Sequence, residues 1–468
     1  MSVDLTLNGR IDTSLLEWKN NPCFIECSPH GKGVPVTALE LRLRIQERTE
    51  QFARWGIQKG FLVPIFLYNS VEFITSLLAL MKLQAIPVMV KLEFRKLALA
   101  EIFKNCKPQA VITETNHLPF IRSYLKDVVV IERSSAGLRL VQSQISSRES
   151  HEVSEDIATV NYTYRGYGYP IGAEVPHRQY LHGAKTLQKG LQANPGEKML
   201  ITLPMSHIFT LVGCIAVPIL YNVTGVIAQT FHPRIIFQII RDYSIEYLTS
   251  VPHYYLLLLR LKEKAQKLRS LRAFVCGGSL LTVEDYHKIS QGFEVEVLHG
   301  YGLTECTPVS RNIRGEPKGG TIGPICDQIE CRIDDSTGIG SGEILLNTPY
   351  MTKTYLDRER ETREAFDGDW FKTGDRGYFD GNHLVFSEEL KETRKINGNM
   401  VDLNEIRKAI LLDGQIVEVD IHYKNNALFA RCRASRKAIT PGKTKELATS
   451  LKELLAPYKI PKISLDPG

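Results

Sequence analysis

The sequence lacks the cysteine patterns on which disulfide scaffolds and zinc sites are built. Its nine cysteines are odd in number and scattered, with no Cys-x-x-Cys pair and no cysteine or histidine at a zinc-binding spacing. We therefore expect reduced thiols and a cytoplasmic protein. The opening residues MSVDLTLNGRID also lack a basic segment followed by an apolar core, so we expect no secretory signal peptide.

The sequence also has neither a strong net charge nor an uninterrupted membrane span. The 58 Lys and Arg residues against 52 Asp and Glu residues leave a formal charge of +6, too little over 468 residues to indicate a nucleic-acid partner. Residues 208–228 are long and apolar enough to cross a bilayer, but Pro218, Asn222 and Thr224 interrupt the run. We expect a buried helix and strand here, with membrane contact as the alternative.

What the sequence does contain is the material of a soluble globular protein, with 43% apolar and 24% charged residues. Apolar runs of strand length alternate with helical patterns through most of the chain, as at 61–68, 71–83 and 85–91. This alternation predicts an α/β fold with doubly wound parallel sheets. A polar stretch from Gln142 to Asp156 predicts a surface connection and a subdomain break near 142–158.

The last 80 residues follow a different pattern. Residues 401–412 predict a helix with Asp402 or Asn404 as its N-cap, alternating strands follow, and 443–458 predict an amphipathic helix. The sequence thus predicts a large domain over 1–386, which ends in short β segments, a hinge at 387–391, and a small mobile α+β domain at 392–468. Fifteen Lys and Arg against ten Asp and Glu lie from Glu389 onward, so most of the net charge is there.

Five segments carry the chemical information. They are Tyr162–Gly172, Leu203–Phe209, Cys276–Ser279, Gly300–Glu305, and Trp370–Asp375 with Asn397-Gly398 beyond it. In order and spacing they resemble the motifs of the adenylate-forming superfamily, which includes acyl- and aryl-CoA synthetases, adenylation domains of nonribosomal peptide synthetases, and luciferases. The resemblance runs from about residue 20 to 462.

The resemblance implies a role for each retained polar residue. Glu305 would hold Mg²⁺, which prefers hard oxygen ligands, and Thr304 would contact the α-phosphate. Asp375 would accept hydrogen bonds from the ribose hydroxyls. His207 would bind the substrate carboxylate, and Lys391 occupies the hinge position about which the small domain moves in relatives.

The resemblance also implies a nucleotide-binding surface built largely from backbone. Paired glycines let a turn pass close to a planar base because no Cβ intervenes. The candidates at the adenine are Gly277, Gly278, Ser279, Tyr301 and Gly302. The candidates in the segment that stands for the phosphate loop are Thr163, Arg165, Gly166 and Gly168.

The phosphate-loop segment departs from the family pattern. Tyr164, Arg165 and Tyr167 replace small hydroxyl residues, and Ile171 replaces a lysine. A phosphate cradle needs backbone amides and small hydroxyls that converge on the oxygens, so we expect bulky aromatic rings to fill that space. Arg165 would still be able to contact an anion.

Two further departures concern positive charge. Glu388 and Glu389 stand where relatives have Gly-Arg, so the charge near the ribose is inverted. Relatives also continue beyond the position of Gly468 to a lysine that bridges carboxylate and α-phosphate, and no residue here corresponds to it. Because preorganised donors at developing charge supply much of catalysis, we expect adenylation to be impaired.

The leading hypothesis is a divergent AMP-forming ligase that activates a carboxylic acid. The alternatives are a pseudoenzyme that binds an acyl or nucleotide ligand or scaffolds a biosynthetic complex, and acyl transfer without adenylation. The implied cofactors are ATP or AMP and Mg²⁺, with coenzyme A or phosphopantetheine as thiol acceptors. The implied partners are a small acyl or aryl acid and an acyl or peptidyl carrier protein, whose acidic surface the basic small domain would suit.

Overall fold

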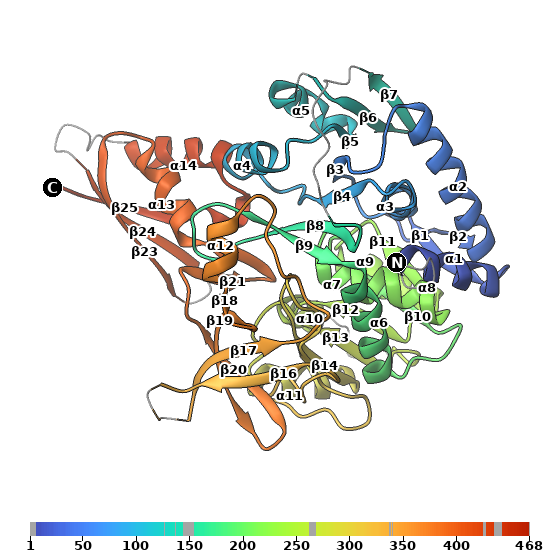
Figure 1. Ribbon diagram of the computed structural model, residues 1–468. Helices are drawn as coiled ribbons and strands as arrows, with labels where there is room; N and C mark the ends of the chain where they lie inside the picture. Colours follow the sequence, from blue (N-terminus) through green and yellow to red (C-terminus); the bar gives the residue numbers. More distant parts are fainter. Residues whose placement is uncertain are drawn as a thin grey trace.

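The computed structural model describes residues 6–125, 127–135, 137–143, 154–261, 268–336, 338, 340–424, 427–434 and 442–467. Two large sheets form the body of the molecule, and a smaller sheet leads to the C-terminal domain (Figure 1). The polar connection predicted at 142–156 lies mostly outside the described residues.

The two large sheets are parallel inside and antiparallel at their outer strands. The first contains, in spatial order, β7 (Gly137–Gln142), β6 (Val129–Ser134), β5 (Ala110–Glu114), β3 (Leu62–Phe66), β4 (Ile86–Met89), β8 (Ile157–Thr163) and β9 (Ile171–Pro176). The second contains β15 (Ser310–Arg311), β14 (Glu296–Tyr301), β13 (Ala273–Cys276), β12 (Tyr247–Ser250), β10 (Lys198–Ile201), β11 (Thr224–Ala228), β1 (Pro22–Cys27) and β2 (Gly33–Thr37). Only the outer pairs β6–β7, β8–β9, β14–β15 and β1–β2 are antiparallel among the described strands of these two sheets. The predicted doubly wound α/β fold is confirmed.

Helices cover both faces of each sheet. Between the sheets lie α1 (Leu7–Trp18), α2 (Ala38–Arg54), α3 (Val71–Lys82), α6 (His177–Leu191), α7 (Ile208–Thr210), the π-helix η3 (Leu211–Ala216) and α8 (Val217–Tyr221). The outer face of the first sheet carries α4 (Lys96–Cys106) and α5 (Leu118–Tyr124), with the short η2 (Thr115–His117) beside it. The outer face of the second carries α9 (Pro233–Asp242), α10 (Pro252–Leu261) and α11 (Val283–Phe293).

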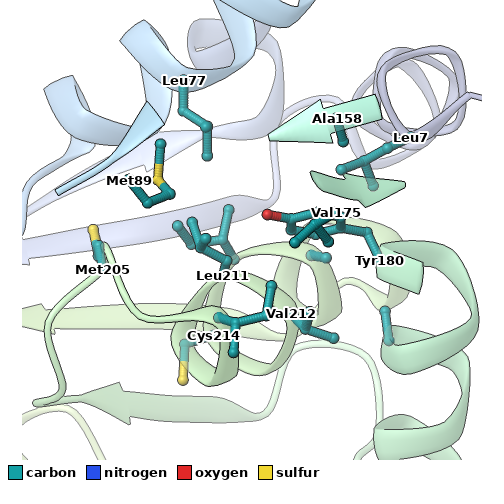
Figure 2. Close-up of a cluster of buried hydrophobic side chains, with 14 of the residues drawn as sticks. Leu7, Leu77, Met89, Ala158, Val175, Tyr180, Met205, Leu211, Val212 and Cys214 are labelled. Carbon is teal, nitrogen blue, oxygen red and sulfur yellow. The ribbon is translucent and has the colours of Figure 1, made fainter. Parts of the chain in front are cut away.

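The central core follows from the two-residue period of the strands. In β3, Val63 and Ile65 face the layer between the sheets, whereas Leu62 and Phe66 face the outer helices, so both faces of the strand are buried. Figure 2 shows side chains of α3, β4, β8, β9, α6 and η3 converging in that central layer.

The apolar run at 208–228 belongs to this packing. It forms α7, η3, α8 and β11, and most of its side chains are buried. None of the described helices is long and apolar enough to cross a membrane.

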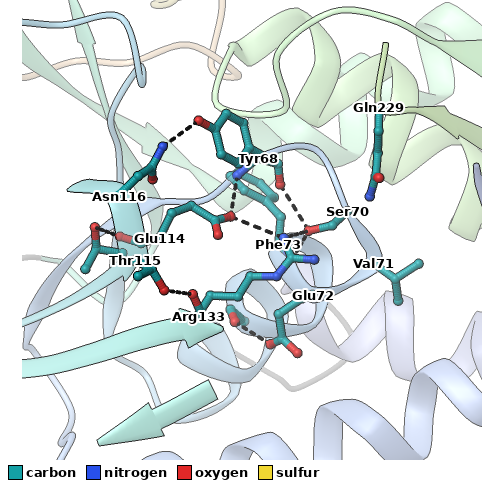
Figure 3. Close-up of polar contacts among 12 residues, drawn as sticks. Tyr68, Ser70, Val71, Glu72, Phe73, Glu114, Thr115, Asn116, Arg133 and Gln229 are labelled. Carbon is teal, nitrogen blue, oxygen red and sulfur yellow. Dashed lines mark hydrogen bonds and ion pairs between the residues drawn. The ribbon is translucent and has the colours of Figure 1, made fainter. Parts of the chain in front are cut away.

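A polar network fixes the start of α3 (Figure 3). Ser70 caps the helix by accepting from the Phe73 amide (3.2 Å), and Arg133 donates to both Ser70 Oγ (2.8 Å) and Glu114 Oε1 (3.3 Å). The same carboxylate oxygen accepts from the Tyr68 amide (3.0 Å). The network therefore ties the loop after β3 to the ends of β5 and β6.

The same loop also holds the segment before α7. The side chain of Asn69 donates to the Leu203 carbonyl (2.7 Å) and accepts from the Met205 amide (2.8 Å). His207 lies two residues further on, so its position depends on contacts made by the first sheet.

The third sheet carries the chain into the small domain. It contains β16 (Glu330–Asp334), β17 (Gly342–Asn347), β19 (Trp370–Asp380), β18 (Phe366–Asp367) and β20 (His383–Glu389), with α12 (Glu359–Glu364) beside it. Among the short β segments predicted for the end of the large domain, the region around Tyr355 forms only an isolated bridge to Ala173. In β20, Glu388 and Glu389 pair with Arg376 and Asp375, so the predicted hinge at 387–391 begins inside a strand.

The small domain is an α+β unit. It contains β21 (Thr393–Ile396), β22 (Asn399–Asp402), α13 (Leu403–Leu411), β23 (Ile416–Lys424), β24 (Ala427–Ala434), α14 (Lys443–Leu454), η5 (Pro457–Lys459) and β25 (Lys462–Pro467). Asp402 is the N-cap of α13, because its carboxylate accepts from the amides of Asn404 and Glu405.

A buried ion pair joins the small domain to the altered loop. Lys459 donates to Glu405 Oε2, and the two side chains are only 1% and 3% exposed. The Tyr164 hydroxyl donates to the other carboxylate oxygen (2.7 Å), and the Lys459 ammonium lies 3.8 Å from the centre of the Tyr164 ring. Tyr164 is thus a contact between domains.

We predict that Glu405→Ala lowers the free energy of unfolding of the small domain by about 3–5 kcal/mol, because it leaves a buried ammonium unpaired. Urea denaturation measures the loss. The matched control is Glu418→Ala, since Glu418 pairs with Arg433 where both side chains are more than half exposed, and it should cost less than about 1 kcal/mol. Equal losses in the two variants would contradict the assignment.

Candidate active site

One cavity lies where the large domain meets the small-domain hairpin β21–β22. The predicted residues that line it are Thr163, Arg165, His207, Gly277, Gly278, Tyr301, Gly302, Thr304, Glu305, Asp375 and Lys391. Gly166, Gly168 and Ser279 lie outside this lining. The turns after β13 and β14 contribute Gly277, Gly278, Thr304 and Glu305, as expected for the carboxyl edge of a parallel sheet.

The glycine turn after β13 packs closely against its neighbours. Gly278 has φ +75°, a conformation that residues with a Cβ rarely adopt. A Cβ at this position would lie 3.8 Å from the Cα of Gly398, so the hairpin β21–β22 passes directly over the turn. The small domain therefore forms one wall of the cavity.

A tyrosine and a lysine hold the carboxylate of Asp375. Its Oδ2 accepts from the Tyr301 hydroxyl (2.7 Å) and pairs with Lys395 Nζ (3.3 Å), and the aspartate is 4% exposed. Burial and the neighbouring carboxylate raise the pKa of Tyr301 well above its ordinary value, so it stays a donor. Lys395 was not predicted as a site residue. Its position two residues before the motif residues Asn397-Gly398 was the feature of the sequence that could have indicated it.

Glu305 is also buried, and one of its two carboxylate oxygens accepts hydrogen bonds from the protein. Arg165 lies 3.4 Å from Oε1 and donates to the Lys372 carbonyl (2.6 Å), while Tyr355 donates to the same Oε1. Arg165 also stacks on the ring of Phe371, with 4.7 Å to its centre. The arginine thus contacts a carboxylate of the protein.

The donor set for Mg²⁺ is small. Among the described residues, no group of three or more His, Cys, Asp or Glu side chains is placed to hold a metal. Glu305 Oε2 accepts no hydrogen bond from any described residue, so it offers one oxygen to the cavity. Mg²⁺ often takes one carboxylate and completes its shell with phosphate oxygens and water, so the residues fit the ion in company with a nucleotide.

The amides of the altered loop bind the small domain. Asp402 Oδ2 accepts from the amides of Gly166 (3.1 Å) and Gly168 (3.0 Å), and Asn404 donates to the Gly166 carbonyl (2.8 Å). Two amides converging on one carboxylate oxygen form the arrangement that binds anions in phosphate loops. Here the anion is a side chain of the small domain.

The loop tyrosines do not fill the cavity in the way the sequence predicted. Tyr164 lines it, packs in the large-domain cluster that includes Phe94, and contacts Glu405 and Lys459 of the small domain. Tyr167 and Tyr169 stack on each other at 5.9 Å and donate to Glu364 and Glu361 of α12, and neither lines the cavity. The expectation that a bulky ring occupies the phosphate space is wrong for Tyr167, because α12 offers it a carboxylate acceptor.

The predicted hinge segment contains a half-buried lysine and a half-buried acid. Lys391 donates to the Thr373 carbonyl (2.6 Å), and burial, with a smaller effect from the Arg165 charge, lowers its pKa to about 7. Glu389 accepts from the Lys395 amide (3.2 Å), and burial raises its pKa.

His207 caps the short helix α7. Its Nδ1 accepts from the Phe209 amide (3.3 Å), which leaves Nε2 as the protonated nitrogen of the neutral ring. Burial, and then the positive charge of Lys91, lower its pKa to about 3. At neutral pH the imidazole is therefore an uncharged hydrogen-bond donor towards the cavity.

Comparison with known proteins agrees with this geometry. A model of the family described as AMP-binding enzyme matches residues 12–356. Peroxisomal OPC-8:0-CoA ligase 1 of Arabidopsis thaliana is 27% identical over 472 residues, which cover 93% of this chain and 85% of that protein.

Solved structures share the fold over nearly the whole chain. A double mutant of o-succinylbenzoate CoA synthetase from Bacillus subtilis, bound with its product analogue, superimposes with a TM-score of 0.84 at 21% identity, covering 98% of this chain and 94% of that chain. The unliganded form of that synthetase gives 0.70 at 20% identity, with the same two coverages.

We predict that the pH dependence of the free energy of unfolding depends on the half-buried Lys391. Its pKa of about 7 in the folded chain is below the unfolded value, so between the two the unfolded chain binds the extra proton and stability rises with pH. Relative to Lys391→Met, the wild type should gain roughly 1 kcal/mol per pH unit above pH 7. Urea denaturation at several pH values measures it. Lys452→Met, at an exposed position of α14, is the control. Parallel profiles of wild type and Lys391→Met would contradict it.

Proposed function

The chain belongs to the AMP-binding enzyme family, and we propose that it is an AMP-forming ligase that joins a small acyl or aryl carboxylic acid to the thiol of coenzyme A. In this reaction a carboxylate oxygen attacks the α-phosphorus of ATP and pyrophosphate leaves. The thiol sulfur then attacks the acyl carbonyl and AMP leaves. A carrier-bound phosphopantetheine presents the same thiol and is the alternative acceptor. The free state of all nine cysteines supports the cytoplasm as the proposed compartment.

The observation that carries this proposal is the shared cavity of the glycine turn, the buried carboxylates and the histidine. Gly277 and Gly278 would lie against the adenine. Asp375, already oriented by Tyr301, would accept from the ribose hydroxyls through its remaining oxygen lone pairs.

The remaining groups face the reacting atoms. Thr304 would donate to the α-phosphate and His207 Nε2 to the substrate carboxylate. Glu305 would hold Mg²⁺ together with the phosphates, and the ion would supply positive charge there. Lys395, near the ribose site, and Lys391 are the cations available to offset phosphate charge.

We predict that Asp375→Ala lowers kcat/KM for acid-dependent AMP formation by about 10² or more, because a buried ribose acceptor is lost. The assay is a panel of fatty and aryl acids with ATP and coenzyme A, together with exchange of labelled pyrophosphate into ATP. Asp380→Ala is the matched control, since Asp380 lies on the same strand but pairs with Lys318 at the surface. Unchanged activity in Asp375→Ala would refute the nucleotide site.

A second candidate function is acyl transfer to the thiol without efficient adenylation. The contact between Asp402 and the amides of Gly166 and Gly168 favours it, because those amides are then not available to a triphosphate. A binding protein without turnover is the outcome if neither half-reaction occurs.

We predict that Asp402→Ser raises the rate of pyrophosphate exchange relative to that of thiolysis of a supplied acyl-adenylate. Serine keeps an N-cap on α13 but loses the charge that binds the loop amides. The two half-reactions are measured separately in wild type and variant. A wild type in which exchange is already as fast as thiolysis would remove the reason for the second candidate.

A further inference from the structure

Positive charge in the cavity exceeds negative charge. Five cationic side chains and two carboxylates line it among the described residues: Lys91, Arg165, Arg311, Lys391 and Lys395 against Glu305 and Asp375. Arg165 faces Glu305, and Lys395 faces Asp375. Each carboxylate therefore already has a cationic partner, and the other cations have none among the described residues.

Arg311 is the most buried of the cations left without a carboxylate. It lies on β15, is 7% exposed, and donates through Nε to the Thr186 carbonyl (2.7 Å). Neither Nη atom has a hydrogen-bond acceptor among the described residues, and the guanidinium forms no ion pair with them. Asp327, whose pKa Arg311 helps to lower, is bound to Lys189 at the surface (2.6 Å). A buried cation without a counter-charge is costly, so the free protein maintains an unfavourable arrangement here.

The helix beside Arg311 makes room for it. A Cβ at Gly190 of α6 would lie only 2.5 Å from Arg311 Nε. Glycine inside a helix lowers helix stability by about 1 kcal/mol relative to alanine. At position 190 the missing side chain leaves the space that the guanidinium needs. The arginine is thus accommodated by the local sequence.

The cavity lining also includes apolar side chains. They are Leu187 and Leu191, which lie on either side of Gly190 on α6, together with Met199, Val217 and Leu298; the polar Ser310 and Asn312 flank Arg311 in the chain. Three of the elements that contribute these apolar side chains, α6, α8 and β10, carry none of the proposed nucleotide-binding residues. An apolar wall with one cationic group fits an organic acid that carries a second negative charge.

We propose that the substrate is a dicarboxylic acid, and that Arg311 binds its second carboxylate through Nη1 and Nη2 while the first carboxylate reacts. The proposal rests on the proposed function for the fate of the first carboxylate. With Nε held by Thr186, the two Nη atoms form an end-on pair that matches the two oxygens of a carboxylate.

A second unpartnered cation lies beside the reacting end. Lys91 lines the cavity, its ammonium has no hydrogen-bond acceptor among the described residues, and its charge acts on His207. The cavity thus offers one unpaired cation near His207 and another on the apolar wall. Two separated cations suit a dianionic acid better than a fatty acid.

The test compares straight-chain dicarboxylic acids with monocarboxylic acids of the same carbon number. Acid-dependent AMP formation is measured for wild type, Arg311→Met and Arg311→Lys. The wild type should prefer the best diacid at least about tenfold, as expected for a charged hydrogen bond. Arg311→Met should lose about 10²-fold in kcat/KM on that diacid and change by less than about threefold on the monoacid, with Arg311→Lys between the two.

The control is Arg314→Met, because Arg314 donates to the Tyr247 hydroxyl and does not line the cavity. It should leave the ratio of diacid to monoacid unchanged. Equal losses on both acids in Arg311→Met would show that the arginine only supports α6, and no diacid preference in the wild type would overturn the proposal.

Binding separates this proposal from the proposed function. Calorimetric titration of the AMP-loaded chain with the same acids needs no turnover. If no acid yields AMP, yet the wild type binds a diacid at least about tenfold more tightly than the monoacid and Arg311→Met loses that difference, the proposed reaction fails and the diacid site stands. Absence of any diacid preference in binding overturns the diacid site.

Discussion

The arrangement of the whole site depends on one carboxylate, that of Asp402. It starts α13 by accepting from the amides of Asn404 and Glu405, and it joins the domains by accepting from those of Gly166 and Gly168. Because of this contact the hairpin β21–β22 covers the glycine turn and places Lys395 on Asp375. A cavity with walls from both domains follows from it.

Inside that cavity, both buried carboxylates form pairs with cations of the protein. Each buried carboxylate is matched by a cation from another segment of the chain, Glu305 by Arg165 and Asp375 by Lys395. The altered loop contributes the first of these cations, so its arginine is paired inside the protein. Of the three cations without a carboxylate partner, Lys391 is assigned above to the phosphates, and Arg311 and Lys91 mark the places where the protein has left room for further negative charge from outside.

Much of the fold and part of the site could be predicted from the sequence. Apolar runs and helical patterns located β3, α3 and β4 at the predicted 61–68, 71–83 and 85–91, and the motif residues Thr304, Glu305 and Asp375 do line one cavity. Asp402 was predicted as a helix cap because capping is local, but its contact with the loop depends on how the domains pack.

Other features carried no local signal. Arg311 belongs to no short pattern, and only its burial beside the cavity distinguishes it from a surface cation. Tyr167 was expected to block the phosphate space, but its acceptor Glu364 lies on α12, almost two hundred residues further along the chain. Pairings of this kind depend on the tertiary fold.

The double role of Asp402 has a consequence for solution conditions. Any small oxyanion that reaches the amides of Gly166 and Gly168 competes with a carboxylate of the protein itself. Inorganic phosphate or sulfate in a buffer would therefore compete with Asp402 for these amides and weaken the contact between the domains. The degree of domain closure in solution would then depend on which salt is present.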